Sequence, residues 1–149
     1  MKRAFTMIEL VFTIIILGIL ASTAIPRLVA TRNDAEISKF AMHVAMSVMD
    51  IGVYYTAKGE FGDIKKMTHS ALDSNGKIKI KSIECAQISA GYATSSEVDP
   101  IKGIIVGTPI VRIVAINSIN KICLDAQDAV KKIIDSSPIN VGQQNVKFN

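Results

Sequence analysis

The chain of 149 residues has no tryptophan, only 5% aromatic residues, and two histidines, His43 and His69. So few aromatic rings disfavour a surface that stacks on nucleic-acid bases or sugars. Two histidines, set far apart, do not form the spacing of a metal centre. We therefore expect no resident metal and no cofactor.

Common catalytic motifs are also missing. The sequence has no glycine-rich loop of the kind that cradles phosphate, and no Ser/His/Asp order with a recognisable nucleophile turn. We do not expect an enzyme. The positive mean hydropathy argues against a disordered chain, and the length allows one domain plus an appendage.

The apolar residues are concentrated near the N-terminus. No side chain from Leu10 to Ile25 is charged, and back to Phe5 only Glu9 interrupts the run. A helix over this stretch is about 32 Å long, against a hydrocarbon core of roughly 30 Å. The pattern predicts a transmembrane helix over residues 5–26. Lys2 and Arg3 precede it, so we expect a cytoplasmic N-terminus and an exported remainder.

A secretory signal peptide is the alternative interpretation of the same segment. Lys2-Arg3 has the charge of its first region, and Ser22-Thr23-Ala24 resembles a cleavage site after Ala24. Glu9 inside the apolar run argues against it, as does the helical pattern that continues through residues 27–30.

Glu9 is the most informative residue of this segment, because a carboxylate in an apolar membrane helix costs a few kcal/mol. It therefore needs a partner. Cleavage between Ala4 and Phe5 would create an α-amino group four residues before Glu9, and a cation on a neighbouring chain could serve equally. Alternatively, the side chain reaches the cytoplasmic interface.

The sequence Lys2-Arg3-Ala4 followed by Phe-Thr-Met-Ile-Glu-Leu over residues 5–10 resembles the processing signal of type IV pilins and of the pseudopilins of type II secretion and DNA-uptake systems. The resemblance covers about residues 2–30. It implies that residues 1–4 are a leader, which a prepilin peptidase removes before methylating Phe5. Ala4 departs from the family, which usually has glycine before the cut.

The resemblance also implies roles for three residues of the helix. Glu9 would pair with the N-terminus of an adjacent subunit during filament assembly. Gly18 and Pro26 lie where the family commonly places residues that loosen the helix. Removal of the leader would lower the net charge from +4 to +2, because Lys2 and Arg3 are lost, so the charge does not indicate nucleic-acid binding.

The function implied is that of a structural subunit of a pilus-like filament, most similar to a pseudopilin of a type II secretion or DNA-uptake (transformation) system. Its expected partners are copies of itself, other pilin-like subunits, the prepilin peptidase, an inner-membrane assembly platform and the lipid bilayer. The C-terminal domain would be periplasmic. A type IV pilus pilin for adhesion or motility, and an anchored binding protein that never polymerises, are the alternatives.

The helix is expected to kink or loosen at Pro26 rather than end there, and to continue past the membrane as an amphipathic element over residues 27–58. Apolar residues recur there at steps of three and four. They are Ile37, Phe40, Ala41, Val44, Val48, Ile51 and Tyr55. Lys58-Gly59 predicts the C-terminal cap. We also expect Met42, Met46 and Met49 to be packing residues.

The fold class expected is α+β, with the long helix packed on a small antiparallel sheet formed by residues 59–149. A loop over residues 59–76 should end in a turn at Asp73–Gly76, which we prefer to a calcium loop. Strands are predicted at Lys77–Lys81, Ile104–Val106, Ile110–Ile116 and Ile119–Leu124, with a turn at Asn117-Ser118. A helix capped by Asp125 should span Ala126–Asp135, and a weak pattern suggests a strand at Val146–Phe148.

Cys85 and Cys123 are the only two cysteines, and both belong to the part expected to be exported. Oxidising compartments permit disulfides, so a bond between them is the simplest prediction. Two unpaired thiols are the alternative.

Overall fold

A computed structural model describes residues 6–142 of the chain. The predicted cleavage between Ala4 and Phe5 and the strand at Val146–Phe148 lie outside the described residues. The helices are α1 (Met7–Lys58), α2 (Ile64–Met67), the single 3-10 turn η1 (Ser95–Glu97), α3 (Lys121–Ala129) and α4 (Lys131–Asp135). The strands are β1 (Lys77–Ile80), β2 (Ile83–Tyr92), β3 (Pro109–Ala115) and β4 (Ile139–Asn140).

The chain divides into two compact units, Met1–Ala35 and Glu36–Asn149. The described part of the first unit is the beginning of α1, and the second unit contains the rest of α1 and every other element. The predicted helix over residues 5–26 and its continuation over 27–58 are confirmed from Met7 to Lys58, and α1 continues through Pro26. Gly59 ends it as expected: its φ is +74°, and its N–H donates to the carbonyl of Tyr55 at 2.7 Å.

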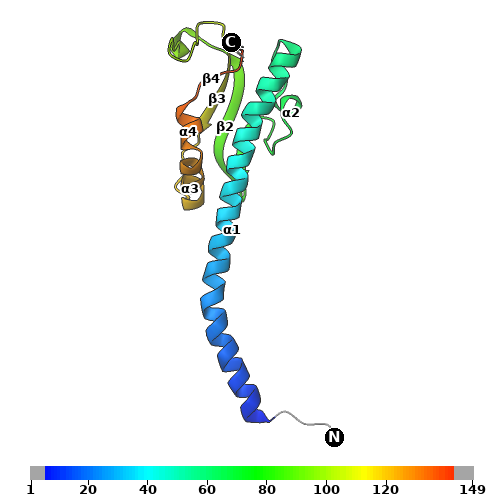
Figure 1. Cartoon of the computed structure of the whole chain (residues 1–149), viewed down its shortest axis with the longest axis vertical. Coiled ribbons are helices and arrows are strands. Elements are labelled where there is room, and N and C mark those ends of the chain that lie inside the picture. The colour runs from blue at the N-terminus through cyan, green and yellow to red at the C-terminus, as the bar shows by residue number, and fades with distance from the viewer. Residues whose placement is uncertain (1–5, 143–149) are drawn as a thin grey trace, which may run out of the picture. The chain divides into compact units, whose positions relative to one another are not determined.

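The second unit is an α+β fold, as predicted. Its four strands are antiparallel and follow one another in the order β1-β2-β3-β4. Figure 1 shows α1 on one side of the strands and α3 with α4 on the other. The sheet contributes buried Ile78, Ile88 and Val111 to a core that α1 completes with Phe40, Val44 and Ile51.

The strand β1 confirms the alternation of its sequence. Ile78 and Ile80 are buried, while Lys79 points to solvent from the edge of the sheet. The turn before it also forms as predicted: Oδ1 of Asp73 accepts from the backbone N–H groups of Asn75 and Lys77, both at 2.9 Å. These bonds show how the carboxylate stabilises the turn.

Strand β2 was missed, although it is the longest strand and pairs with both β1 and β3. Its sequence contains Ala, Ser, Gly and Gln, which carry little β-propensity. A two-residue turn, Lys81-Ser82, joins it to β1, and both residues have positive φ (47° and 72°). In a sequence, a turn with this backbone conformation is normally recognised by the pair Asn-Gly. Lysine and serine are not typical of such a turn, so the sequence did not indicate it.

Two predicted strands are wrong. Around Ile104, only an isolated bridge to Asp99 forms, and Val106 lies in a turn. The segment predicted as a strand at Ile119–Leu124 begins α3 instead, because Asn120 caps the helix and its side chain accepts from the N–H of Ile122. Because α3 begins at Lys121, Asp125 lies inside the helix and is not its N-cap as predicted.

Three further expectations need correction. The predicted helix over 126–135 is two helices, α3 and α4, which meet at Val130. The loop over 59–76 contains the one-turn helix α2, anchored by the buried Met67. Met42, Met46 and Met49 are 55%, 42% and 69% exposed, so they do not pack in this chain's core.

Candidate functional site

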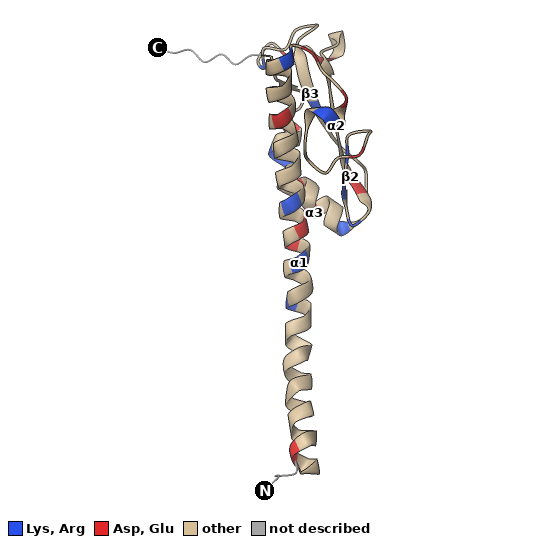
Figure 2. Ribbon diagram, turned by 90° about the vertical axis from the view of Figure 1, so that its right-hand side faces the viewer, with Lys and Arg blue, Asp and Glu red and all other residues tan. Residues whose placement is uncertain are grey.

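The candidate site is the first part of α1, because its apolar side chains have no cover within the chain. α1 is the one helix among residues 6–142 that is long and apolar enough to cross a membrane, a property that a signal sequence shares. Each large apolar side chain from Met7 to Val29 is at least 41% exposed. Figure 2 shows one acidic position near the start of α1 and then a long stretch without charged residues, which in the sequence runs from Leu10 to Pro26. Such a helix suggests membrane anchoring or a signal.

The hydroxyl groups of this segment are satisfied inside the helix. The side chains of Thr13, Ser22, Thr23 and Thr31 donate to the carbonyl three residues earlier, at 2.7–3.0 Å. A hydroxyl bonded in this way carries no unmet donor into an apolar surrounding. The helix therefore suits either lipid or a bundle of apolar helices.

Glu9 lies in the first turn of α1. Its Oε2 accepts a long hydrogen bond from Oγ1 of Thr6 at 3.4 Å, and the side chain is exposed. Carboxylates in the first turn of a helix are favoured by the unpaired N–H groups and the helix dipole. Sequence reasoning missed this local role of Glu9, which the start of the helix at Met7 reveals. The long hydrogen bond from Thr6 leaves most of the Glu9 carboxylate open to an external partner.

Gly18 and Pro26 both lie within the uncovered helix. A Cβ placed on Gly18 would meet no atom within 4 Å, so packing inside this chain does not require glycine there. Pro26 has no N–H to donate to the carbonyl of Ser22, which weakens the helix locally without ending it. Both residues are exposed, so neither packs against another described segment of this chain.

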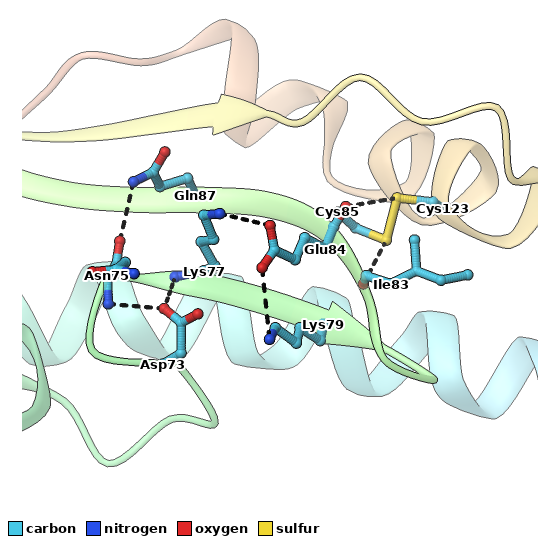
Figure 3. A network of polar contacts seen from close by, with 9 residues as sticks. All are labelled: Asp73, Asn75, Lys77, Lys79, Ile83, Glu84, Cys85, Gln87 and Cys123. Carbon is cyan, nitrogen blue, oxygen red and sulfur yellow. Dashed lines mark hydrogen bonds and ion pairs between the residues drawn. A yellow bond between two sulfur atoms is a disulfide. The ribbon is translucent and has the colours of Figure 1, made fainter.

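In the second unit, the disulfide between Cys85 and Cys123 holds α3 against β2 (Figure 3). The Nε2 of Gln127 strengthens the same junction: it donates to the carbonyls of Cys85 at 2.7 Å and Ile116 at 2.8 Å. The expected cysteine pair is therefore bonded, and the amide of Gln127 satisfies two carbonyls that α3 covers.

Charged side chains pair along the edge of the sheet. Figure 3 shows Glu84 between two lysines: its Oε2 is 2.6 Å from Nζ of Lys77, and its Oε1 is 3.6 Å from Nζ of Lys79. The hydrogen bond from Lys77 lowers the pKa of Glu84. Among residues 6–142, no group of three His, Cys, Asp or Glu side chains is placed to hold a metal ion.

No protein-family model, curated protein or solved structure matches this chain. A long N-terminal helix with an apolar first part, packed by its second part on a four-stranded antiparallel sheet with a disulfide, is a pilin-like fold.

Proposed function

We propose that this chain is a non-enzymatic structural subunit of a pilus-like filament, most similar in role to a pseudopilin of a type II secretion or DNA-uptake system. The observation that carries the proposal is the first part of α1, whose uncharged side chains from Leu10 to Ile25 are exposed in the isolated chain. A helix that is apolar all round needs cover on every side. Lipid supplies that cover before assembly and neighbouring helices supply it afterwards.

Transfer from lipid to a bundle costs little, because the two surroundings are similarly apolar. In this proposal, a prepilin peptidase cuts between Ala4 and Phe5 and methylates Phe5, and an inner-membrane platform then extracts the subunit. The Glu9 carboxylate pairs with the Phe5 amine of a neighbouring subunit. Each charge then has a partner inside an apolar bundle, where an unpaired one would be costly.

The test combines processing with crosslinking in the full-length chain. Mass spectrometry of the mature protein should find a methylated Phe5 at its N-terminus; a mature chain beginning at Ile25 would contradict the proposal and support a secretory signal. In filaments, the double variant Leu17→Cys/Ile25→Cys, treated with a thiol crosslinker, should give a ladder of crosslinked multimers, because each chain then offers two thiols. A single band would favour the anchored binding protein that never polymerises.

Glu9→Ala is the matched test of the charge pair. The variant should insert in the membrane like the native chain but fail to enter filaments, since it leaves the Phe5 amine unpaired. Glu36→Ala, which removes a carboxylate of the same helix outside the apolar segment, is the control. Normal incorporation of Glu9→Ala would sink the assigned role of Glu9.

A further inference from the structure

The second unit has one end at which α1 enters it, and the packing of its aromatic side chains identifies that end. Tyr55 of α1 packs against Tyr92, the last residue of β2, with ring centroids 6.4 Å apart. From Glu36 to Tyr55, α1 rises about 29 Å. From Ile83 to Tyr92, β2 rises about 30 Å. Figure 1 shows the two elements side by side, so α1 enters the unit beside the start of β2.

We call this end of the second unit the entry end. It is formed by the turn at residues 81–82 before β2 and by residues 115–121, which join β3 to α3. The N–H of Ile116 donates to the carbonyl of Cys85 at 3.0 Å. The connection between β3 and α3 is therefore held beside the first residues of β2.

Exposed aliphatic side chains gather in the part of the sequence that forms the entry end. Ile119 is fully exposed, and Val114 and Leu124, on either side of it in the sequence, are 58% and 45% exposed. Covering a large aliphatic side chain removes apolar surface from water and is favourable. Exposed apolar side chains that lie close together therefore indicate contact with another surface.

Cations accompany these side chains. Lys121 is exposed at the start of α3, and Lys81 is exposed in the turn before β2. Glu84, the first acidic residue of β2, is already held by two lysines of β1, and Asp125 lies one turn further into α3. Aliphatic side chains beside cations are typical of protein surfaces that lie on anionic lipid headgroups.

The connection through α1 keeps the entry end near a membrane. Residues 27–35 of α1 separate the predicted membrane segment, residues 5–26, from the second unit. A helix of this length is about 14 Å long, which limits the separation whatever the orientation of the two units. The opposite end of the second unit lies about 33 Å further along α1. The entry end is therefore the part of this unit that the connection holds nearest to lipid.

We propose that the entry end rests on the lipid surface before assembly, with Ile119 in the headgroup region and Lys121 beside anionic headgroups. The inference rests on the proposed function, because it requires that α1 anchor the chain in a membrane. It adds a second lipid contact to that anchor. One aliphatic side chain and one or two cations bind lipid weakly, so extraction of the subunit can break the contact.

The first experiment uses the full-length chain in vesicles of phosphatidylcholine and phosphatidylglycerol. A spin label at Asn117→Cys reports on the entry end. The same label at Ile101→Cys, which is 98% exposed in the loop between β2 and β3, is the matched control. Because Cys85 and Cys123 are bonded to each other, only the introduced thiol is labelled.

The measurement compares collisions of the label with oxygen, which concentrates in lipid, and with a nickel chelate, which stays in water. The ratio of oxygen to nickel collisions should be several-fold higher at residue 117 than at residue 101. Equal ratios would overturn the inference. Protection of residue 117 that appears only when each vesicle holds many copies would also overturn it, because a second copy would then cover the entry end.

A label at Leu17→Cys separates this inference from the proposed function. If residue 17 lies in lipid while residue 117 lies in water, the membrane anchor stands and the lipid contact of the entry end is wrong. If residue 17 also lies in water, α1 does not anchor the chain. The proposed function then fails together with the inference.

Two substitutions test the chemistry of the contact, each with the label at residue 117. Ile119→Ser should expose the label to the nickel chelate. Lys121→Glu should shift the equilibrium about tenfold toward the free entry end in vesicles with phosphatidylglycerol, because it reverses a charge at the lipid surface. The shift should be much smaller in phosphatidylcholine alone.

Lys65→Glu, the same charge change at an exposed position of α2, is the control for Lys121→Glu. It should leave the label at residue 117 in lipid. Equal effects of the two charge reversals would overturn the inference, because net charge rather than a local contact would then be responsible. The thermal unfolding temperature of Ile119→Ser should match that of the native chain, because the side chain is fully exposed.

Discussion

Arg112 and Glu97 form a two-pronged ion pair that ties strand β3 to the 3-10 turn η1. The Nη2 of Arg112 donates to Oε2 of Glu97 at 2.7 Å, and its Nε donates to Oε1. The same Oε2 accepts from the N–H and Oγ1 of Thr94, at 2.9 and 2.8 Å, which completes a capping box. The loop between β2 and β3 is thus fastened to the sheet by one carboxylate.

This arrangement predicts acid sensitivity. The hydrogen bond from Arg112, assisted by those from Thr94, lowers the pKa of Glu97 from 4.5 to about 2. Between these values the unfolded chain binds a proton that the folded chain does not, so acid favours unfolding. The stabilisation is therefore complete above about pH 4.5 and is lost as the pH falls toward 2.

Glu97→Gln should lower the unfolding midpoint in denaturant at pH 7 and flatten its dependence on pH between 4.5 and 2. Some dependence should remain, because the pKa values of Asp73 and Glu84 are lowered too. Glu60→Gln, which changes an exposed carboxylate, is the control. An unchanged acid slope in Glu97→Gln would show that the pair does not govern it.

The disulfide provides a second prediction. Cys85 and Cys123 are 38 positions apart, and in the chain-entropy model a loop of that size contributes about 4 kcal/mol to the free energy of unfolding. Cys85→Ala/Cys123→Ala should lose about this much, measured by denaturant titration of the full chain. Reduction of the native protein is a second route and should agree in direction. A midpoint that neither change moves would contradict the prediction.

Gln127 should contribute more to the free energy of unfolding than its partly exposed position in α3 suggests. Gln127→Glu preserves size but replaces the donating amide with an oxygen that faces the carbonyls of Cys85 and Ile116. We expect a loss of about 1–3 kcal/mol in the free energy of unfolding. Asp128→Asn, at an exposed position of the same helix, should change it little. Equal effects of the two substitutions would refute the bridging role.

Two glycines with the same backbone conformation form a matched pair. Gly59 and Gly76 both have a φ of +74°, but a Cβ on Gly76 would lie 2.0 Å from the carbonyl oxygen of Ile88, whereas one on Gly59 would meet nothing within 4 Å. Gly59→Ala should cost about 1–2 kcal/mol from its backbone conformation alone. Gly76→Ala should cost clearly more, because the turn must move away from β2. Thermal unfolding of both variants checks the order.

The sequence predicted those features of the fold that depend on interactions within a few residues of the chain. The uncharged run from Leu10 to Ile25 predicts an apolar helix, because its length and composition suffice. Gly59 marks the end of α1, and Asp73 marks the turn before β1, because each acts on backbone within a few residues. The cap at Asn120 was equally local and was overlooked in favour of the Ile-rich composition of the segment.

Other features depend on contacts that sequence order does not show. Strand β2 has weak local propensity and becomes a strand because β1 and β3 pair with its two edges. Met42, Met46 and Met49 were predicted to be packing residues; they are exposed because the sheet packs on the opposite face of α1. Likewise, Arg112 and Glu97 are brought together only when the loop after β2 closes onto β3.

The sequence by itself therefore determined the apolar helix, its cap and the alternation of β1, since hydrophobic length, turn chemistry and side-chain period act over short stretches. Tertiary structure alone decided which face of α1 is covered, which strands lie at the centre of the sheet, and which charged side chains form ion pairs. Those outcomes depend on burial against distant segments, and burial is a property of the assembled fold.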